Sequence, residues 1–140
     1  MHFEREFTVA RARAEVVALL DDDATIESLL PGTTITSHGD GSRETRTPSP
    51  LGGARDIRFL FRREPRDRLC FEKICDGNIW RSLDGEVRLE ELGTDRTRVL
   101  LRMEGRTRTL VPELTIHGPL RAQIEQMTKA LRMRLEGGGL

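Results

Sequence analysis

The sequence lacks the features that mark several common classes of protein. Its 23 lysine and arginine residues balance 23 aspartate and glutamate residues, so the formal net charge is zero. Nucleic-acid-binding domains are usually basic overall, and the balance therefore predicts no nucleic-acid partner. No apolar run approaches the roughly 18 residues of a membrane-spanning helix, and the N-terminal segment has no apolar core of signal-peptide length. We expect no membrane insertion and a cytoplasmic location.

Cysteine and histidine are also scarce. Cys70 and Cys75 are five residues apart in one predicted strand, and an odd separation sends side chains to opposite faces, so we expect no disulfide between them. His2, His38 and His117 have no cysteine or histidine partner at the spacing of zinc ligands. The sequence contains no glycine-rich phosphate-binding fingerprint and no Walker lysine. We therefore predict no metal site and no cofactor.

The chain is long enough for one domain. Its 140 residues match the usual domain size, and we expect a single domain over residues 1–136 and a flexible tail over 137–140. The segment HFEREFTVA alternates apolar and polar residues, which predicts a first strand. Two short helices are expected next, the second beginning near Asp23 and ending before Pro31-Gly32.

Strand patterning continues through the middle of the chain. From Ala54 to Thr109 the apolar side chains recur at odd-numbered positions, which predicts consecutive antiparallel strands with one dry face. Between two of these strands a three-residue loop, Asp76-Gly77-Asn78, keeps the odd-numbered residues of both strands on that face. This loop predicts that Phe71 lies opposite Leu83 and that Lys73 lies opposite Arg81.

The last segment predicts one long amphipathic helix from about Pro119 to Glu136, with VPELTIH before it as a lead-in or a kinked extra turn. Its apolar stripe recurs at steps of three and four residues, and its length would be about 27 Å at 1.5 Å per residue. Only this stripe is long enough to cover the dry face of the strands. We therefore predict an α+β fold in which a bent antiparallel sheet of about seven strands wraps around the closing helix.

Three segments together resemble a known superfamily. They are FTVARARAEVVALLDDDATIESLLPGTTIT, the hairpin run from Ala54 to Thr109, and the closing helix. They are similar to the START and polyketide cyclase-like (SRPBCC) superfamily, which has the helix-grip fold. The nearest branch is that of proteins like the G subunit of carbon monoxide dehydrogenase, in which LPG follows the second short helix. The absence of tyrosine departs from the richer members, whose pockets often use it as a polar contact.

The resemblance implies a hydrophobic cavity between sheet and helix that holds a lipid, polyketide, quinone or similar molecule. The protein would then be a carrier or sensor, with a cyclase, aromatase or dehydratase as the alternative. A second alternative is a protein-interaction module with a filled core, in which the same apolar residues are plain packing. The expected lining consists of Phe59, Phe61, Phe71, Leu83, Val87, Leu89, Val99, Leu101 and Met103 from the sheet and Leu120, Ile124, Met127 and Leu131 from the helix.

Charged residues at odd-numbered positions provide a second set of candidates. Arg5, Lys73 and Arg81 fall on the predicted dry face, where an unpaired charge is costly. A carboxylate or phosphate headgroup bound between Lys73 and Arg81 would relieve their repulsion. The alternative is that both side chains reach water at the hairpin tip.

Two further residues have a functional and a structural interpretation. His117 precedes the predicted helix, where it could act as a general acid or base on a ligand carbonyl, because histidine titrates near neutrality. A cap or surface role is the alternative. Trp80 falls on the outer face of the sheet in the expected register, where with Leu60 and Leu100 it would offer a homodimer surface; scattered surface residues would need no such role.

Overall fold

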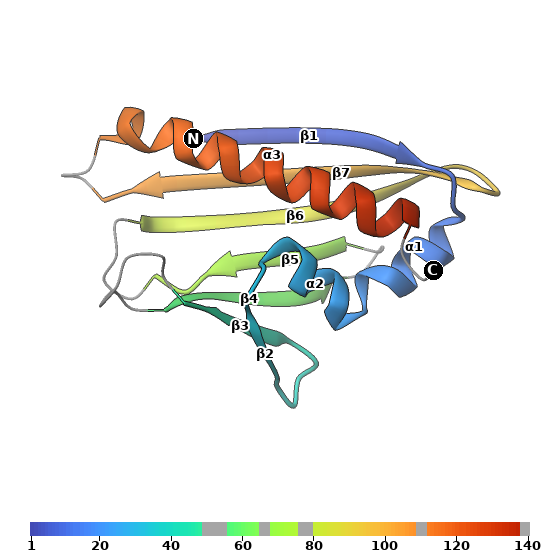
Figure 1. The fold of residues 1–140 in the computed structure, drawn as a ribbon, viewed down its shortest axis with the longest axis horizontal. Helices are drawn as coiled ribbons and strands as arrows, with labels where there is room; N and C mark the ends of the chain where they lie inside the picture. The colour runs from blue at the N-terminus through green and yellow to red at the C-terminus, as the bar shows by residue number, and fades with distance from the viewer. Residues whose placement is uncertain (49–55, 65–67, 76–79, 109–111, 138–140) are drawn as a thin grey trace.

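The computed structural model describes residues 1–48, 56–64, 68–75, 80–108 and 112–137. Within these ranges the chain forms seven strands and three helices, shown in Figure 1. The predicted Asp76-Gly77-Asn78 loop and the 137–140 tail lie wholly or mostly outside the described residues. The elements are β1 (His2–Val9), α1 (Arg13–Leu20), α2 (Asp23–Leu29), β2 (Thr34–Ser37), β3 (Arg43–Thr47), β4 (Ile57–Glu64), β5 (Arg68–Lys73), β6 (Trp80–Gly93), β7 (Arg96–Thr107) and α3 (Glu113–Gly137).

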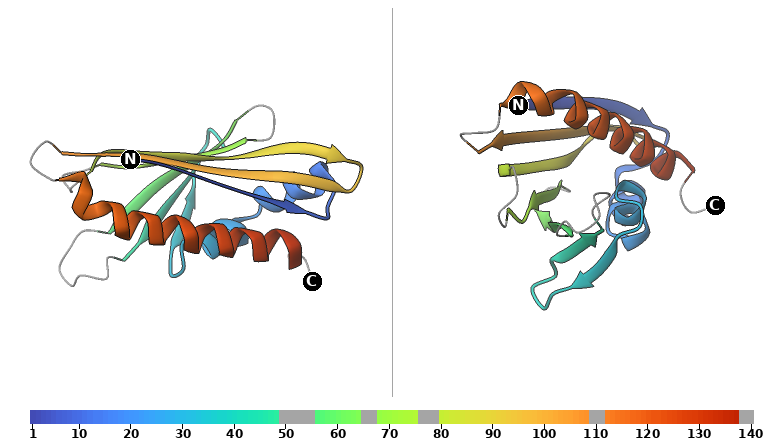
Figure 2. Two further views of the ribbon diagram at one scale, coloured as in Figure 1. Left: turned by 90° about the horizontal axis from the view of Figure 1, so that it is seen from above. Right: turned by 60° about the vertical axis from the view of Figure 1, so that its left-hand side comes forward.

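The strands form one antiparallel sheet in the order β1-β7-β6-β5-β4-β3-β2. The two helices that follow β1 carry the chain to the opposite edge of the sheet, so β1 and β2 are the two edge strands. In Figures 1 and 2 the sheet bends around α3, and α1 and α2 lie beside the C-terminal half of that helix. The predicted helix-grip α+β fold is confirmed.

The core lies between the inner face of the sheet and the apolar stripe of α3. Over most of the sheet the odd-numbered strand residues face inward, because successive strand residues alternate between faces, and the exceptions lie near the start of β6. The stripe on α3 is the predicted one, with steps of three and four residues. The side chains without any exposed surface include Val87, Val99, Leu101 and Met103 from the sheet and Ile124, Leu131 and Leu135 from α3.

The register between β5 and β6 differs from the prediction by two residues. Phe71 lies opposite Gly85 rather than Leu83, and Leu69 lies opposite Val87, so Lys73 is not opposite Arg81. A Cβ atom at Gly85 would overlap the ring of Phe71 and the carbonyl oxygen of Arg102. The aromatic ring thus occupies the space that a side chain at residue 85 would need, as in aromatic rescue of a strand glycine.

Trp80 lies in the core, so its predicted place on the outer face is wrong, while the homodimer expected there stays a prediction. Trp80 pairs with Thr107 and Ser82 with Arg106, so β6 carries one extra residue at this point. Such a bulge inverts the alternation of faces. The indole consequently packs against the inner face, where a Cβ atom at Gly105 would lie 2.7 Å from its Cζ3 atom.

The closing helix begins at Glu113, six residues before the predicted start, so the segment before Pro119 forms extra helical turns rather than a lead-in, and Pro119 lies inside the helix. Proline lacks the N–H that an interior helical residue donates, so its presence removes one backbone hydrogen bond. The extra turns are held instead by side-chain packing, since Ile116 packs against the core and the ring of His117 lies 5.0 Å from that of Phe3.

No helix in the described part of the chain is both long enough and apolar enough to span a membrane.

Candidate functional site

An apolar pocket lies where α2, the ends of β3 and β4, and the middle of α3 meet. Its volume is about 140 Å³. Of the lining residues expected from the sequence, Phe59 and Met127 border it. The described residues that line it are Leu29, Leu30, Pro31, Thr47, Ile57, Phe59, Gln123, Gln126 and Met127.

The wall formed by α2 depends on how that helix ends. Leu29 is the last helical residue, and Leu30 and Pro31 carry the chain past the pocket. The backbone N–H of Thr33 then donates to the carbonyl of Leu30 at 3.2 Å. Gly32 closes this turn with φ at 81°, a conformation that residues with a side chain rarely adopt. The Leu-Pro-Gly sequence therefore shapes one side of the pocket.

The facing wall is formed by β3, β4 and α3. Thr47 lies opposite Ile57 on the neighbouring strand, and its hydroxyl donates to that of Thr33 at 3.0 Å. This hydrogen bond ties the chain beyond α2 to the sheet. Gln123 and Met127 are one helical turn apart on α3, so their side chains project from the same face of the helix.

Three ion pairs hold the corner between α1 and α2 in place. Asp21 pairs with Arg63 of β4 at 2.9 Å. Asp22 pairs with Arg134 of α3 at 2.9 Å. The third pair joins Asp23 to Arg43 of β3 at 2.8 Å. The Asp-Asp-Asp sequence thus connects the N-terminal end of α2 to all three elements that complete the pocket.

Most of the other predicted lining residues are packed core in this structure. A side chain with 0% exposure touches neither solvent nor a void that admits a water molecule, so it borders no cavity of that size. Phe61 and Leu120 are also almost fully buried, and Leu89 is partly buried. Phe71 and Leu83, each 3% exposed, border a second, larger hollow instead. Contact of any of these residues with a ligand stays a prediction. The residues with 0% exposure are Val87, Val99, Leu101, Met103, Ile124 and Leu131.

Arg5 is paired with an acidic side chain of α3. Its guanidinium donates from Nε and Nη2 to the Glu125 carboxylate at 3.1 and 2.7 Å. These hydrogen bonds, together with the positive charge of Arg5, lower the pKa of Glu125 below its usual 4.5. The pair fastens α3 to the edge strand β1 and accounts for a charged residue on the inner face.

His117 is exposed near the start of α3 and packs against Phe3. It is not among the described residues that line the apolar pocket. Among the described residues no carboxylate pairs with its ring, whereas His2 and His38 each have a glutamate within 4 Å. The packing supports the structural interpretation of His117, and its catalytic role stays a prediction.

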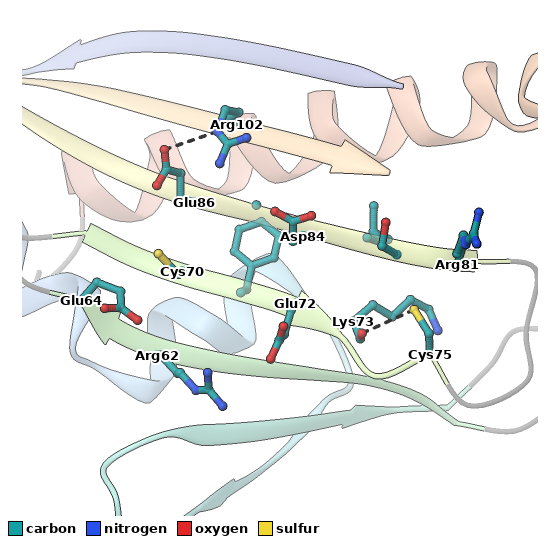
Figure 3. A pocket seen from close by; sticks show the side chains of 14 residues that line it. Arg62, Glu64, Cys70, Glu72, Lys73, Cys75, Arg81, Asp84, Glu86 and Arg102 are labelled. Atoms are coloured by element: carbon teal, nitrogen blue, oxygen red, sulfur yellow. Dashed lines mark hydrogen bonds and ion pairs between the residues drawn. The ribbon is translucent and has the colours of Figure 1, made fainter. Parts of the chain in front are cut away.

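A larger hollow, about 420 Å³ in volume, opens on the outer face of the sheet. Arg62, Cys70, Glu86 and Arg102 form a row across four neighbouring strands and line this outer trough (Figure 3). Glu86 is only 7% exposed and forms ion pairs with Arg68 and Arg102 at 3.2 and 3.3 Å. The floor of the trough therefore consists largely of charged side chains that form ion pairs with one another.

Lys73 and Arg81 line this outer trough rather than the apolar pocket. Glu72 and Asp84 project beside them from paired positions of β5 and β6 (Figure 3). Positive and negative side chains are interspersed here, as on an ordinary solvated sheet surface. The headgroup site was predicted because Lys73 and Arg81 were expected to lie opposite each other on β5 and β6. In the observed register they do not.

Sequence patterns alone did not identify most of the pocket. Its members come from α2, two strands and α3, which are separated by long stretches of chain. Gln123 and Gln126 flank the apolar stripe of α3 and look like surface residues in the sequence. The signal that was available is Leu-Pro-Gly, which predicted the end of α2 but not that its residues form a wall.

No protein-family model matches the sequence, and no curated protein matches it. Solved structures nevertheless superpose over nearly the whole chain. The Zhui aromatase/cyclase from Streptomyces sp. R1128 is 20% identical, with a TM-score of 0.66 and coverage of 99% of this chain and 98% of that one. TTHA0849 from Thermus thermophilus is 13% identical, with a TM-score of 0.72 and full coverage of both chains. A START superfamily protein from Mycobacterium smegmatis is 15% identical, with a TM-score of 0.70 and 96% coverage of each chain.

Proposed function

We propose that this chain, which has the helix-grip fold of the START and polyketide cyclase-like superfamily, binds a small hydrophobic molecule as a carrier or sensor. The observation that carries the proposal is the apolar pocket between α2, β3, β4 and α3. The narrower resemblance to the G subunit of carbon monoxide dehydrogenase stays a prediction.

The size of the pocket limits what it can hold in this conformation. Its volume is about 140 Å³, and an engineered apolar protein cavity of about 150 Å³ binds benzene. One aromatic ring or a short alkyl chain therefore fits without rearrangement. A typical drug-sized ligand needs a pocket of roughly 300 Å³ or more, and admitting one would require α2 to move away from the sheet.

The chemistry of the lining favours binding over catalysis. Acid–base catalysis needs a titratable side chain within hydrogen-bonding reach of the reacting group. The described residues around the pocket include no such side chain, only apolar groups, one threonine and two glutamines. Although a structural neighbour is named an aromatase/cyclase, we therefore favour a carrier or sensor over a cyclase, aromatase or dehydratase. We also favour it over an interaction module with a filled core, because the pocket leaves part of the space beside α3 unfilled.

Titration with toluene tests the proposal. Isothermal titration calorimetry would compare the wild type with Ile57→Phe, which places a larger side chain in the pocket wall. Leu60→Phe is the matched control, since it also replaces an aliphatic side chain of β4 with phenylalanine, at a half-buried residue outside the pocket lining. We expect toluene to bind the wild type and Leu60→Phe alike, and to bind Ile57→Phe at least tenfold more weakly. Equal binding by all three proteins, or no binding by the wild type, would overturn the proposal.

A further inference from the structure

Two glutamine side chains border the apolar pocket on the side formed by α3. Gln123 is half-buried and Gln126 is exposed, and their spacing of three residues puts them on one face of the helix. Gln123 therefore lies in the wall, and Gln126 lies at the rim. The rest of the described lining is apolar, apart from Thr47.

Neither glutamine amide is hydrogen-bonded to another described residue, whereas the hydroxyl of Thr47 already donates to Thr33. Neither amide is among the buried side-chain groups of the described residues that lack a partner, so water can still reach both of them, and a ligand group would replace that water. An amide carries both a donor and an acceptor, so it can bind a carbonyl or a hydroxyl equally well. The two glutamines thus offer unused hydrogen-bonding capacity at the edge of an apolar space.

Charge argues against an anionic or cationic ligand at this site. Among the described residues that line the pocket none is ionisable. The nearby Glu125 on α3 is engaged by Arg5. Moving an ionised carboxylate or ammonium into such a site without a charged partner is costly. The lining therefore favours an uncharged ligand.

We infer that Gln123 and Gln126 select a neutral ligand that carries a carbonyl or hydroxyl group beside a ring or short alkyl chain. The apolar part lies against residues such as Leu29, Phe59 and Met127, and the polar group meets the amides. This inference rests on the proposed function, because it assigns the ligand class of the same pocket. It makes the two glutamines specificity-determining residues.

Four ligands with one ring each test the inference: toluene, benzyl alcohol, acetophenone and benzoate. Their dissociation constants would be measured by calorimetry for the wild type and for the double variant Gln123→Met, Gln126→Met. Methionine keeps the length of the side chain and its helix propensity but removes the amide. Lys129→Met is the control, since it makes a similar change at an exposed residue of α3 outside the pocket lining.

The informative quantity is the preference for acetophenone over toluene. One hydrogen bond contributes a preference of about fivefold, and we expect the double variant to lose it while Lys129→Met retains it. Benzoate should bind wild type at least tenfold more weakly than acetophenone. An unchanged preference in the double variant, or tight benzoate binding, would overturn the inference while toluene binding upholds the pocket. Failure of toluene itself to bind would overturn both proposals.

Discussion

Arg134, near the end of α3, donates a 2.9 Å hydrogen bond to Asp22, the N-cap residue of α2. The two carboxylate oxygens of Asp22 accept hydrogen bonds from different donors. One accepts from the backbone N–H of Ala24 at 3.0 Å and caps the helix, and the other binds the guanidinium. The same arginine also donates to the hydroxyl of Thr25 at 3.1 Å. The side chain of Asp22 therefore both caps α2 and attaches that helix to α3.

Substitution of Asp22 separates the two contributions. Asp22→Asn keeps an oxygen for the cap but loses the charge, so we expect it to lower the free energy of unfolding by less than about 1 kcal/mol, as is usual for an exposed ion pair. Asp22→Ala also loses the cap and should cost about 1–2 kcal/mol. Urea unfolding of both variants measures the difference, and equal losses would contradict a capping role.

Gly85→Ala should destabilise the sheet strongly. The new methyl group would meet the ring of Phe71 and the backbone oxygen of Arg102, and overpacking of this kind typically costs about 1–3 kcal/mol. Gly93→Ala is the matched control, because a Cβ atom at that end of β6 meets nothing within 4 Å. Thermal unfolding compares the two variants. Similar melting temperatures for both would show that the ring of Phe71 does not occupy this space.

The Arg5–Glu125 pair should make stability depend on acid pH. Arg5 lowers the pKa of Glu125 in the folded protein below its usual 4.5, so the unfolded chain takes up the proton first as the pH falls. The stabilisation is therefore complete above the unfolded-state pKa and is lost as the pH falls through the folded-state pKa.

The variant Glu125→Gln provides the comparison for this pH dependence. Its free energy of unfolding should differ from that of the wild type at pH 7, and the difference should shrink as the pH falls below the usual pKa of 4.5. Because the pair is partly exposed, added salt should also reduce this difference in the free energy of unfolding. Urea denaturation across a pH series gives the measurement. A difference that stays constant down to pH 3 would mean that this carboxylate is not stabilised by Arg5.

The two cysteines should react at different rates. Burial, reinforced by the negative charge of Glu86, raises the pKa of Cys70 above its usual 9.0, so less of the reactive thiolate is present near neutrality. Cys75 is exposed. We expect iodoacetamide at pH 8 to alkylate Cys75 first, as followed by peptide mass spectrometry. Faster alkylation of Cys70 would contradict the environment described for the outer trough.

The parts of the fold that were predicted correctly depend on local periodicity. Alternation at odd-numbered residues indicated the inner face of β4–β7, and the spacing of Leu120, Ile124, Met127 and Leu131 indicated the buried face of α3. Each pattern lies within one element. A bent sheet around one long helix is then the arrangement that buries both apolar surfaces.

The errors come from interactions between elements. A shift of two residues between β5 and β6 leaves every side chain on its own face, so alternation could not show that Phe71 lies opposite Gly85. The bulge near Trp80 reverses which residues of β6 face inward, and no marked feature of the sequence indicates it. Helix extension through Pro119 depends on the packing of Ile116 and His117 against the rest of the protein. The pocket residues were missed for the same reason, since no single segment contains more than three of them.

The most direct test of the account is to locate bound toluene by methyl-resolved NMR spectroscopy. We predict that saturating toluene shifts the methyl resonances of Leu29, Leu30, Ile57 and Met127, which line the apolar pocket, and leaves that of Met133 on the exposed face of α3 unchanged. Shifts confined to residues outside this pocket, or no shifts at all, would contradict the assignment of the hydrophobic ligand site to the space between α2, β3, β4 and α3.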